Sequence, residues 1–262
     1  MIRKIIHIAG VSLVLVALGM LLSFSVSNNM QTVCTHFEIK VRSQSGNYFM
    51  HAGDFRTLIV KDIDTIEGRH ISPEKLQTVH TLIHSMPFVK HANIYRTINN
   101  ELRADIRLRD PLMRVINRHN QSYYVDTQGY MFPLSGTHTA RVMIVSGHVG
   151  AVYEAGKNIR NLDEDKDQKH RDTMNDLFLL ASYIHHDPFW RALIDHIAIL
   201  ENGKFEMIPK NGVHIIEFGY ADNIVDKFNK LRFFYVNGLP EIGWHYYNRI
   251  NLEFNQQVIC SK

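Results

Sequence analysis

Histidine is the residue type in this sequence that most invites a chemical role, because the chain contains 16 of them. His80 and His84 are four residues apart in a stretch with helical periodicity, so both imidazoles can project from one helix face. A zincin motif needs Glu directly after the first histidine to activate a metal-bound water, and Thr81 stands there. Solvated or capping histidines are the simpler interpretation, so we predict no metal site and no cofactor.

Three aspartates at alternate positions suggest a second kind of metal site. Asp163, Asp165 and Asp167 match the spacing of the first three oxygen ligands of a calcium-binding loop. Such a loop also needs a glycine and a bidentate glutamate, but Gln168 and Met174 occupy those positions. A solvated charged loop explains the aspartates more simply.

Catalytic motifs are missing from the sequence. It contains no G-x-S-x-G turn, no P-loop, no dinucleotide fingerprint and no catalytic-cysteine signature. An unmarked Ser-His-Asp arrangement stays open, because a triad is defined by geometry and not by residue order. We nevertheless expect a protein without catalytic residues.

The composition indicates a folded and nearly neutral protein. The chain has 262 residues, 45% of them hydrophobic and 10% aromatic, which excludes a disordered or collagen-like protein. The formal charge is +3, but Arg3 and Lys4 precede a hydrophobic N-terminal run, and without them 27 basic residues face 26 acidic ones. This balance excludes a general nucleic-acid binder, which needs concentrated Lys and Arg.

The hydrophobic run predicts a membrane anchor. Residues 5–26 contain no Asp, Glu, Lys or Arg, and as a helix they would extend about 33 Å, enough for a hydrocarbon core of about 30 Å. By the positive-inside rule residues 1–4 are cytoplasmic, so everything after a polar tether at residues 27–35 is expected in the periplasm of a bacterium with two membranes. The alternative is a signal peptide cleaved after Ser25, although the run exceeds the usual apolar length of such peptides.

Residues 36–110 have the pattern of a small mixed domain. Ser72 as N-cap and Pro73 at the first helical position mark a helix start, and Asn99-Asn100 marks a hairpin turn. In chain order we predict a strand, two helices and two strands, over residues 37–41, 55–63, 73–86, 89–98 and 102–108.

Residues 111–262 have the pattern of a mostly antiparallel β domain with flanking helices, which makes the predicted fold class α+β. Apolar runs between turn sequences predict strands over residues 113–117, 122–125, 140–145, 194–200, 205–208, 213–218 and 250–260. Helical periodicity predicts a helix over 171–185 with a buried stripe of Met174, Leu177, Phe178, Ala181 and Ile184. It predicts another over 223–235 with a stripe of Ile224, Val225, Phe228, Leu231 and Phe234.

The only two cysteines, Cys34 and Cys260, exclude a disulfide-dense scaffold and a four-cysteine zinc site. An oxidising compartment would allow a bond between them, worth roughly 4–5 kcal/mol in the chain-entropy model. The alternatives are two unpaired thiols, or Cys260 as a small buried residue that shares one strand face with Ile250, Leu252, Phe254 and Val258.

Three stretches in a fixed order resemble a known bacterial family. Residues 87–94, P-F-V-K-H-A-N-I, resemble the P-x-V-x-x-A-x-V stretch of a POTRA domain, and Arg109-Asp110-Pro111 resembles the R-x-P that closes it. Residues 124–132, Y-V-D-T-Q-G-Y-M-F, resemble the segment that follows this domain in the cell-division family FtsQ/DivIB. Leu108 departs from the family, which commonly has an acid there. The resemblance covers nearly the whole chain.

This resemblance implies a non-enzymatic divisome protein with a single span in the inner membrane. Its POTRA domain at 36–110 and its β domain at 111–262 would recruit and link periplasmic division partners and coordinate septal peptidoglycan synthesis. The implied partners are FtsB/FtsL-like coiled-coil proteins and other divisome components, with no nucleic acid.

The resemblance also implies a docking strand near the C-terminus. Residues 250–254 resemble the last strand of the family, to which the partner FtsB adds a strand through backbone hydrogen bonds. A partner with a basic residue is expected, because Glu253 stands where the family is usually basic. The alternative is a core strand whose outer edge is covered by its own chain. The expected partner-binding residues are Ile250, Asn251, Leu252, Glu253, Phe254, Val258, Trp244 and Tyr247.

Two other functions fit parts of the sequence. A periplasmic hydrolase or another secreted binding protein would follow from signal-peptide cleavage. A POTRA protein of the outer-membrane assembly machinery would need many amphipathic barrel strands, and the residues after Pro111 contain two predicted helices and too few strands.

Overall fold

The computed structural model describes residues 10, 13–20, 33–161, 168–210 and 214–262. Gly10 and residues 13–20 are helical, and most of the predicted anchor and tether lies outside the described residues. Within the part of the chain that is described, no helix is long and apolar enough to span a membrane. The prediction of an anchor at residues 5–26 therefore stays a prediction.

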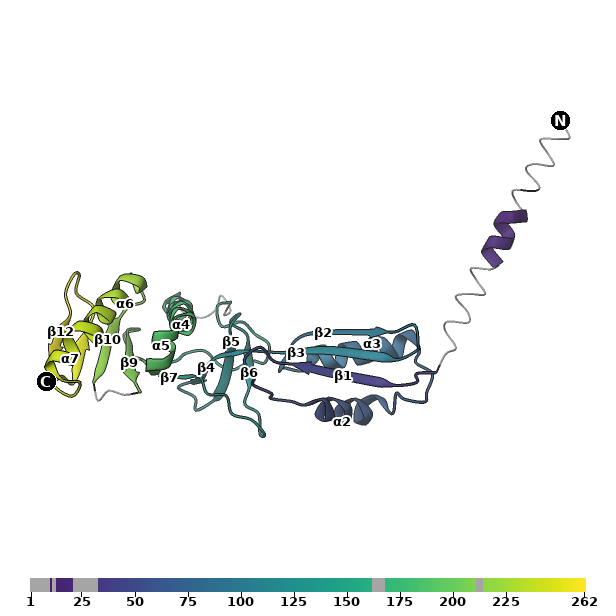
Figure 1. Cartoon of the computed structure of the whole chain (residues 1–262), viewed down its shortest axis with the longest axis horizontal. Helices are drawn as coiled ribbons and strands as arrows, with labels where there is room; N and C mark the ends of the chain where they lie inside the picture. The colour runs from purple at the N-terminus through teal and green to yellow at the C-terminus, as the bar shows by residue number, and fades with distance from the viewer. Residues whose placement is uncertain (1–9, 11–12, 21–32, 162–167, 211–213) are drawn as a thin grey trace, which may run out of the picture. The chain divides into compact units, whose positions relative to one another are not determined.

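Contacts divide the chain into two compact units (Figure 1). The first contains residues 1–42 and 51–107, and the second contains residues 43–50 and 108–262. The short segment 43–50 joins the second unit because Phe49 is fully buried there, with its ring 5.3 Å from Tyr124 and 5.4 Å from Phe132.

The first unit has the predicted order of elements. It contains β1 (Phe37–Arg42), α2 (Ala52–Ile63), α3 (Pro73–Ser85), β2 (Val89–Arg96) and β3 (Leu102–Leu108). The sheet order is β1-β3-β2, and β1 and β3 are parallel. Ser72 caps α3 as predicted, since its Oγ accepts the backbone N–H of Lys75 at 3.2 Å.

The second unit is built on one nine-stranded sheet with the order β12-β11-β10-β9-β8-β7-β4-β5-β6. Parallel pairings at β4–β7, β7–β8 and β10–β11 interrupt an otherwise antiparallel sheet. The strands are β4 (Pro111–Ile116), β5 (Ser122–Asp126), β6 (Met131–Pro133), β7 (Met143–Gly147), β8 (Ile194–Ile199), β9 (Phe205–Pro209), β10 (Ile215–Gly219), β11 (Arg249–Asn251) and β12 (Ile259–Ser261). The helices are α4 (Gln168–His186), α5 (Pro188–Leu193), α6 (Ile224–Phe233), the π-helix η1 (Phe234–Gly238) and α7 (Leu239–Ile242).

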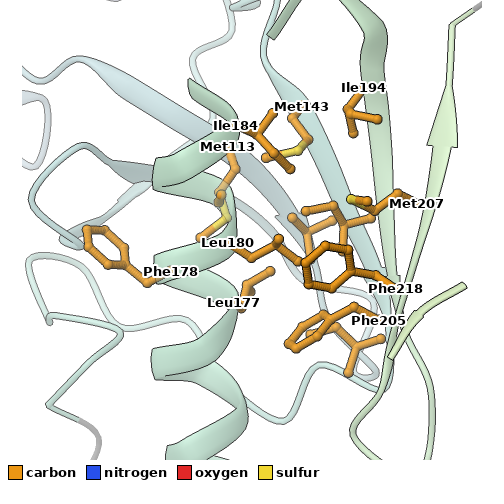
Figure 2. Packing of buried hydrophobic residues seen from close by; sticks show 14 of the residues in the cluster. Met113, Met143, Leu177, Phe178, Leu180, Ile184, Ile194, Phe205, Met207 and Phe218 are labelled. Atoms are coloured by element: carbon orange, nitrogen blue, oxygen red, sulfur yellow. The ribbon is translucent and has the colours of Figure 1, made fainter. Parts of the chain in front are cut away.

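The main core lies between α4 and the sheet (Figure 2). All five residues of the predicted α4 stripe are buried, which confirms the helical periodicity. Figure 2 shows Leu177 and Leu180 on the side of α4 that faces the strands, toward Phe205 and Phe218, and Ile184 on the same side near Met143.

Two sequence predictions for the second unit are wrong. Val225 was expected in the buried stripe of α6, but 55% of it is exposed. The face of α6 that packs on the core carries Ile224, Phe228 and Leu231 at i, i+4 and i+7, and Val225 lies beside that face. The single strand predicted over 250–260 is two short strands, β11 and β12, joined by a turn in which Gln256 has φ +60°. Phe254 consequently leaves the expected inward face and is 47% exposed.

Candidate functional site

The predicted docking strand is already paired on both sides. Ile250 in β11 lies opposite Ile216 of β10 in a parallel pairing and opposite Cys260 of β12 in an antiparallel pairing. Ile250 and Leu252 are fully buried. The expectation that β11 presents an open edge is therefore wrong, and the alternative of a core strand covered by its own chain describes Ile250 and Asn251.

The residues that follow β11 are also held by the molecule itself. Lys230 Nζ donates to the backbone carbonyls of Phe254 at 2.6 Å and Leu252 at 3.3 Å. The backbone N–H of Leu252 donates to the carbonyl of Glu217 at 2.9 Å. Strand addition needs unpaired backbone groups, and these contacts leave residues 252–254 poorly suited to receive a partner.

Glu253 has a basic partner within its own chain. Its Oε2 accepts from Lys204 Nζ at 2.5 Å, and this hydrogen bond raises the pKa of Lys204. The Glu253 stem also lies against Gly219, where an added Cβ would come within 2.6 Å of Glu253 Cγ. Glu253 therefore already has an intramolecular partner, and a basic residue on a binding partner stays a prediction.

The open edge of the sheet is β12. It is the last strand in the sheet order, so among the described residues no further strand pairs with its outer side. Exposed apolar groups lie in the same part of the chain: Ile259 is 42% exposed, Tyr246 49% and Trp244 38%. The Lys262 ammonium lies 4.0 Å from the Tyr246 ring centroid, and Lys262 lowers the pKa of that phenol. We call β12 with Tyr246 and Lys262 the C-terminal edge.

Some of the predicted binding residues lie near the C-terminal edge, and others are held within the fold. Tyr247 packs on Tyr246 with ring centroids 4.9 Å apart, so this predicted rim aromatic adjoins the C-terminal edge. Trp244 instead packs on the buried Tyr235, with ring centroids 5.5 Å apart. Val258 is half-buried, and Asn251 donates to Glu217 Oε2 at 2.6 Å. Ile259 and Lys262 were not predicted as binding residues, although Ile259 lies within the strand predicted over residues 250–260.

The opposite edge of the sheet is covered. Met131 in β6 donates its N–H to the carbonyl of Lys157 at 2.8 Å, and its carbonyl accepts from Gly156 at 2.9 Å. A loop of the chain thus pairs with the backbone of β6, and Pro133 ends that strand. The β6 edge is consequently not available for strand addition in the way that β12 is.

The family-like motif residues near β6 build the fold. Asp126 is 1% exposed; its Oδ2 accepts from Arg109 Nη1 at 2.7 Å, and its Oδ1 accepts the N–H groups of Gln128 and Tyr130, both at 2.8 Å. Gly129 has φ +92°, and a Cβ there would lie 2.6 Å from Asn158 Oδ1. The motif therefore fixes a buried turn and its ion pair.

A serine and a histidine on adjacent parallel strands were missed by the sequence analysis. Ser146 Oγ and His196 Nε2 are 2.8 Å apart, and burial lowers the pKa of His196. A catalytic triad also needs a carboxylate hydrogen-bonded to the other imidazole nitrogen. Among the described residues, no carboxylate is hydrogen-bonded to His196, since the adjacent Asp195 contacts Lys210 instead. The geometry does not support a hydrolase triad here.

The histidine pair lies where the spacing predicted it. The rings of His80 and His84 share one face of α3 with centroids 4.2 Å apart, and His84 Nε2 lies 3.0 Å from the carbonyl oxygen of Ala92. Within the described part of the chain, no group of three or more His, Cys, Asp or Glu side chains could hold a metal ion. The aspartates of the calcium-like loop, Asp163, Asp165 and Asp167, lie outside the described residues.

Both cysteines are free thiols in the structure. Cys34 is buried and its Sγ lies 3.3 Å from the carbonyl oxygen of His36. Cys260 is half-buried in β12, and burial raises the pKa of its thiol. The structure therefore gives no support to the bond between them that the sequence left open.

Comparison with known protein families assigns both units. Residues 110–261 match the family model described as FtsQ/DivIB, C-terminal related. Residues 32–107 match the model of a POTRA-like domain. No curated protein matches the chain.

Proposed function

The chain belongs to the FtsQ/DivIB family of cell-division proteins, and we propose that it links periplasmic division partners without catalysing a reaction. The POTRA-like unit would bind or orient some division components, and the C-terminal edge would capture a coiled-coil protein of the FtsB/FtsL type. Together these contacts would coordinate synthesis of septal peptidoglycan.

The proposed docking site rests on the pairing of the last two strands. β12 is the edge strand of the nine-stranded sheet, whereas β11 is paired on both sides. Strand addition to a sheet edge obtains its affinity from backbone hydrogen bonds and its selectivity from neighbouring side chains. Exposed aromatic residues are common anchors at interfaces, and Tyr246, whose ring contacts Lys262 directly after β12, supplies one. The partner segment would therefore extend the sheet as a further strand next to residues 259–261.

Photo-crosslinking in growing cells tests this site. A crosslinking amino acid at position 259 should capture a small coiled-coil division protein. Position 208 is the matched control, because Ile208 lies in β9 within the same sheet and is 38% exposed, against 42% for Ile259. Adducts of equal yield at both positions, or no adduct at position 259, would contradict docking at β12.

The proposal includes a single membrane anchor at residues 5–26, with the N-terminus in the cytoplasm and both units in the periplasm at the division site. The uncharged N-terminal run and the preceding Arg3 and Lys4 support it. N-terminal sequencing of the membrane-extracted protein should give an intact N-terminus. A mature chain that begins at Val26 would instead support secretion after signal-peptide cleavage.

A further inference from the structure

We propose that a cationic pocket in the second unit binds an acidic peptide segment that carries an apolar residue beside its carboxylates. The pocket is a cavity of about 380 Å³ at the start of β4, β7 and β8, next to the end of α4. Lys210, a residue that lines the pocket, directly follows β9. In the sheet order, β10 and β11 lie between β9 and β12. The pocket is therefore distinct from the C-terminal edge.

The rim of the pocket concentrates positive charge. Four cationic side chains line it, Arg114, Arg141, Arg191 and Lys210, against a single carboxylate, Asp195. This excess of three positive charges equals the formal charge of the entire chain, which is +3. Like charges gathered around one cavity repel one another, and an anionic ligand relieves that repulsion.

The rim charges are largely uncompensated. In the described part of the chain, Arg141 and Arg191 make no side-chain hydrogen bond and no ion pair, and both are exposed. Lys210 Nζ lies 3.9 Å from Asp195 Oδ1, and an exposed contact of this length contributes little. Arg114 is oriented by its Nε hydrogen bond to Ser122 Oγ at 3.0 Å, and its terminal nitrogens are left for a ligand.

The apolar floor of the pocket favours an acidic peptide over an inorganic anion. This floor is closed by Leu112, Met143, Ile184 and Ile194, each at most 9% exposed. Val142 and Ile144 are half-buried and also line the pocket, so they give a ligand apolar surface to cover. An inorganic anion would occupy a small part of 380 Å³ and leave this apolar floor wet, whereas an apolar ligand would leave the guanidinium groups unpaired. A short peptide with an apolar side chain between carboxylates satisfies both parts.

Titration calorimetry on the full chain in detergent tests the proposal with a synthetic Asp-Glu-Leu-Asp peptide. The peptide should bind, and affinity should fall as ionic strength rises. The double variant Arg141→Gln with Arg191→Gln should bind at least tenfold more weakly. Arg118→Gln is the control, because Arg118 is an exposed arginine of the same unit that does not line the pocket.

Three results would overturn the proposal. The double variant could bind the peptide as well as the parent chain, or the amide peptide Asn-Gln-Leu-Asn could bind equally. Inorganic phosphate could also displace the peptide at equal concentration, which would assign the pocket to small anions. Crosslinking at position 259 should be unchanged in the double variant, so the pocket and the docking site are tested separately.

Discussion

The two edges of the nine-stranded sheet differ in how completely the molecule satisfies them. At the β6 edge a loop pairs with Met131, and the buried Asp126 receives an arginine and two backbone N–H groups. At the other end β12 pairs with β11, and no described strand pairs with the outer side of β12. Both regions carry family-like sequence patterns, so such a pattern locates a structural element without showing which of its edges is open.

The largest loss of stability is expected when the β6 end of the sheet loses the ion pair between Arg109 and Asp126. Asp126→Ala leaves the Arg109 side chain, 14% exposed, without its carboxylate and two backbone N–H groups without an acceptor. We expect a loss of about 3–5 kcal/mol in the free energy of unfolding, measured with urea. Asp195→Ala removes a carboxylate that is 56% exposed and should cost less than about 0.5 kcal/mol. Equal losses in the two variants would show that the Asp126 network is not a stabilising centre.

A milder change at the same end tests the turn itself. Gly129→Ala places a Cβ at φ +92° and 2.6 Å from Asn158 Oδ1, so we expect a loss of about 1–3 kcal/mol in urea unfolding. Gly136→Ala is the matched control, because its added Cβ meets nothing within 4 Å and its φ is not in the positive region. If both alanine variants are equally stable, the close approach at Gly129 does not constrain the fold.

At the open edge, substitutions should affect binding and spare stability. Ile259→Lys should weaken capture of the coiled-coil partner about tenfold, equivalent to about 1.4 kcal/mol, since it places a charge beside the incoming strand. Phe254→Lys should have little effect, because Phe254 lies in the turn and its carbonyl is already bonded to Lys230. Co-purification from membranes measures both. The reverse order of effects would restore docking at residues 250–254.

The smallest expected effect is a pH dependence of the stability that comes from His214, the residue before β10. His214 is 1% exposed, its Nε2 lies 2.5 Å from the Tyr235 hydroxyl, and burial lowers its pKa. A histidine with a lowered pKa contributes its full stability above the pKa of the unfolded chain, near 6.5, and loses it as the pH falls toward the folded value. Unfolding free energy should therefore decline between pH 7 and pH 5, and less steeply in His214→Gln. An identical slope in that variant would exclude His214 as a contributor.

Local patterns predicted the parts of the fold that depend on local forces. The α4 stripe follows from a period of 3.6 residues, and the Ser72 cap follows from a side chain three residues from its donor. The C-terminal ribbon depends on distant partners. Lys230 binds carbonyls more than twenty residues away, and the polar run 255–257 turns the chain back so that β12 covers β11. Neither contact has a signature in the sequence around residue 250.

The cationic pocket also could not be predicted from local sequence patterns. Arg114, Arg141, Arg191 and Lys210 come from four separate stretches, and no spacing in the sequence connects them. The sheet order brings them together, because β4, β7 and β8 are adjacent although 30 or more residues separate their starts. Sequence patterns predicted the family and most elements, whereas the open edge and the pocket required three-dimensional pairing.

Hydrogen exchange of the chain with and without its coiled-coil partner tests most directly whether β12 receives a foreign strand. If β12 is the docking edge, amides in the peptide covering residues 259–261 gain protection in the complex, while those of β6, residues 131–133, exchange as before. A complex that forms without any new protection at residues 259–261 would contradict docking at this edge.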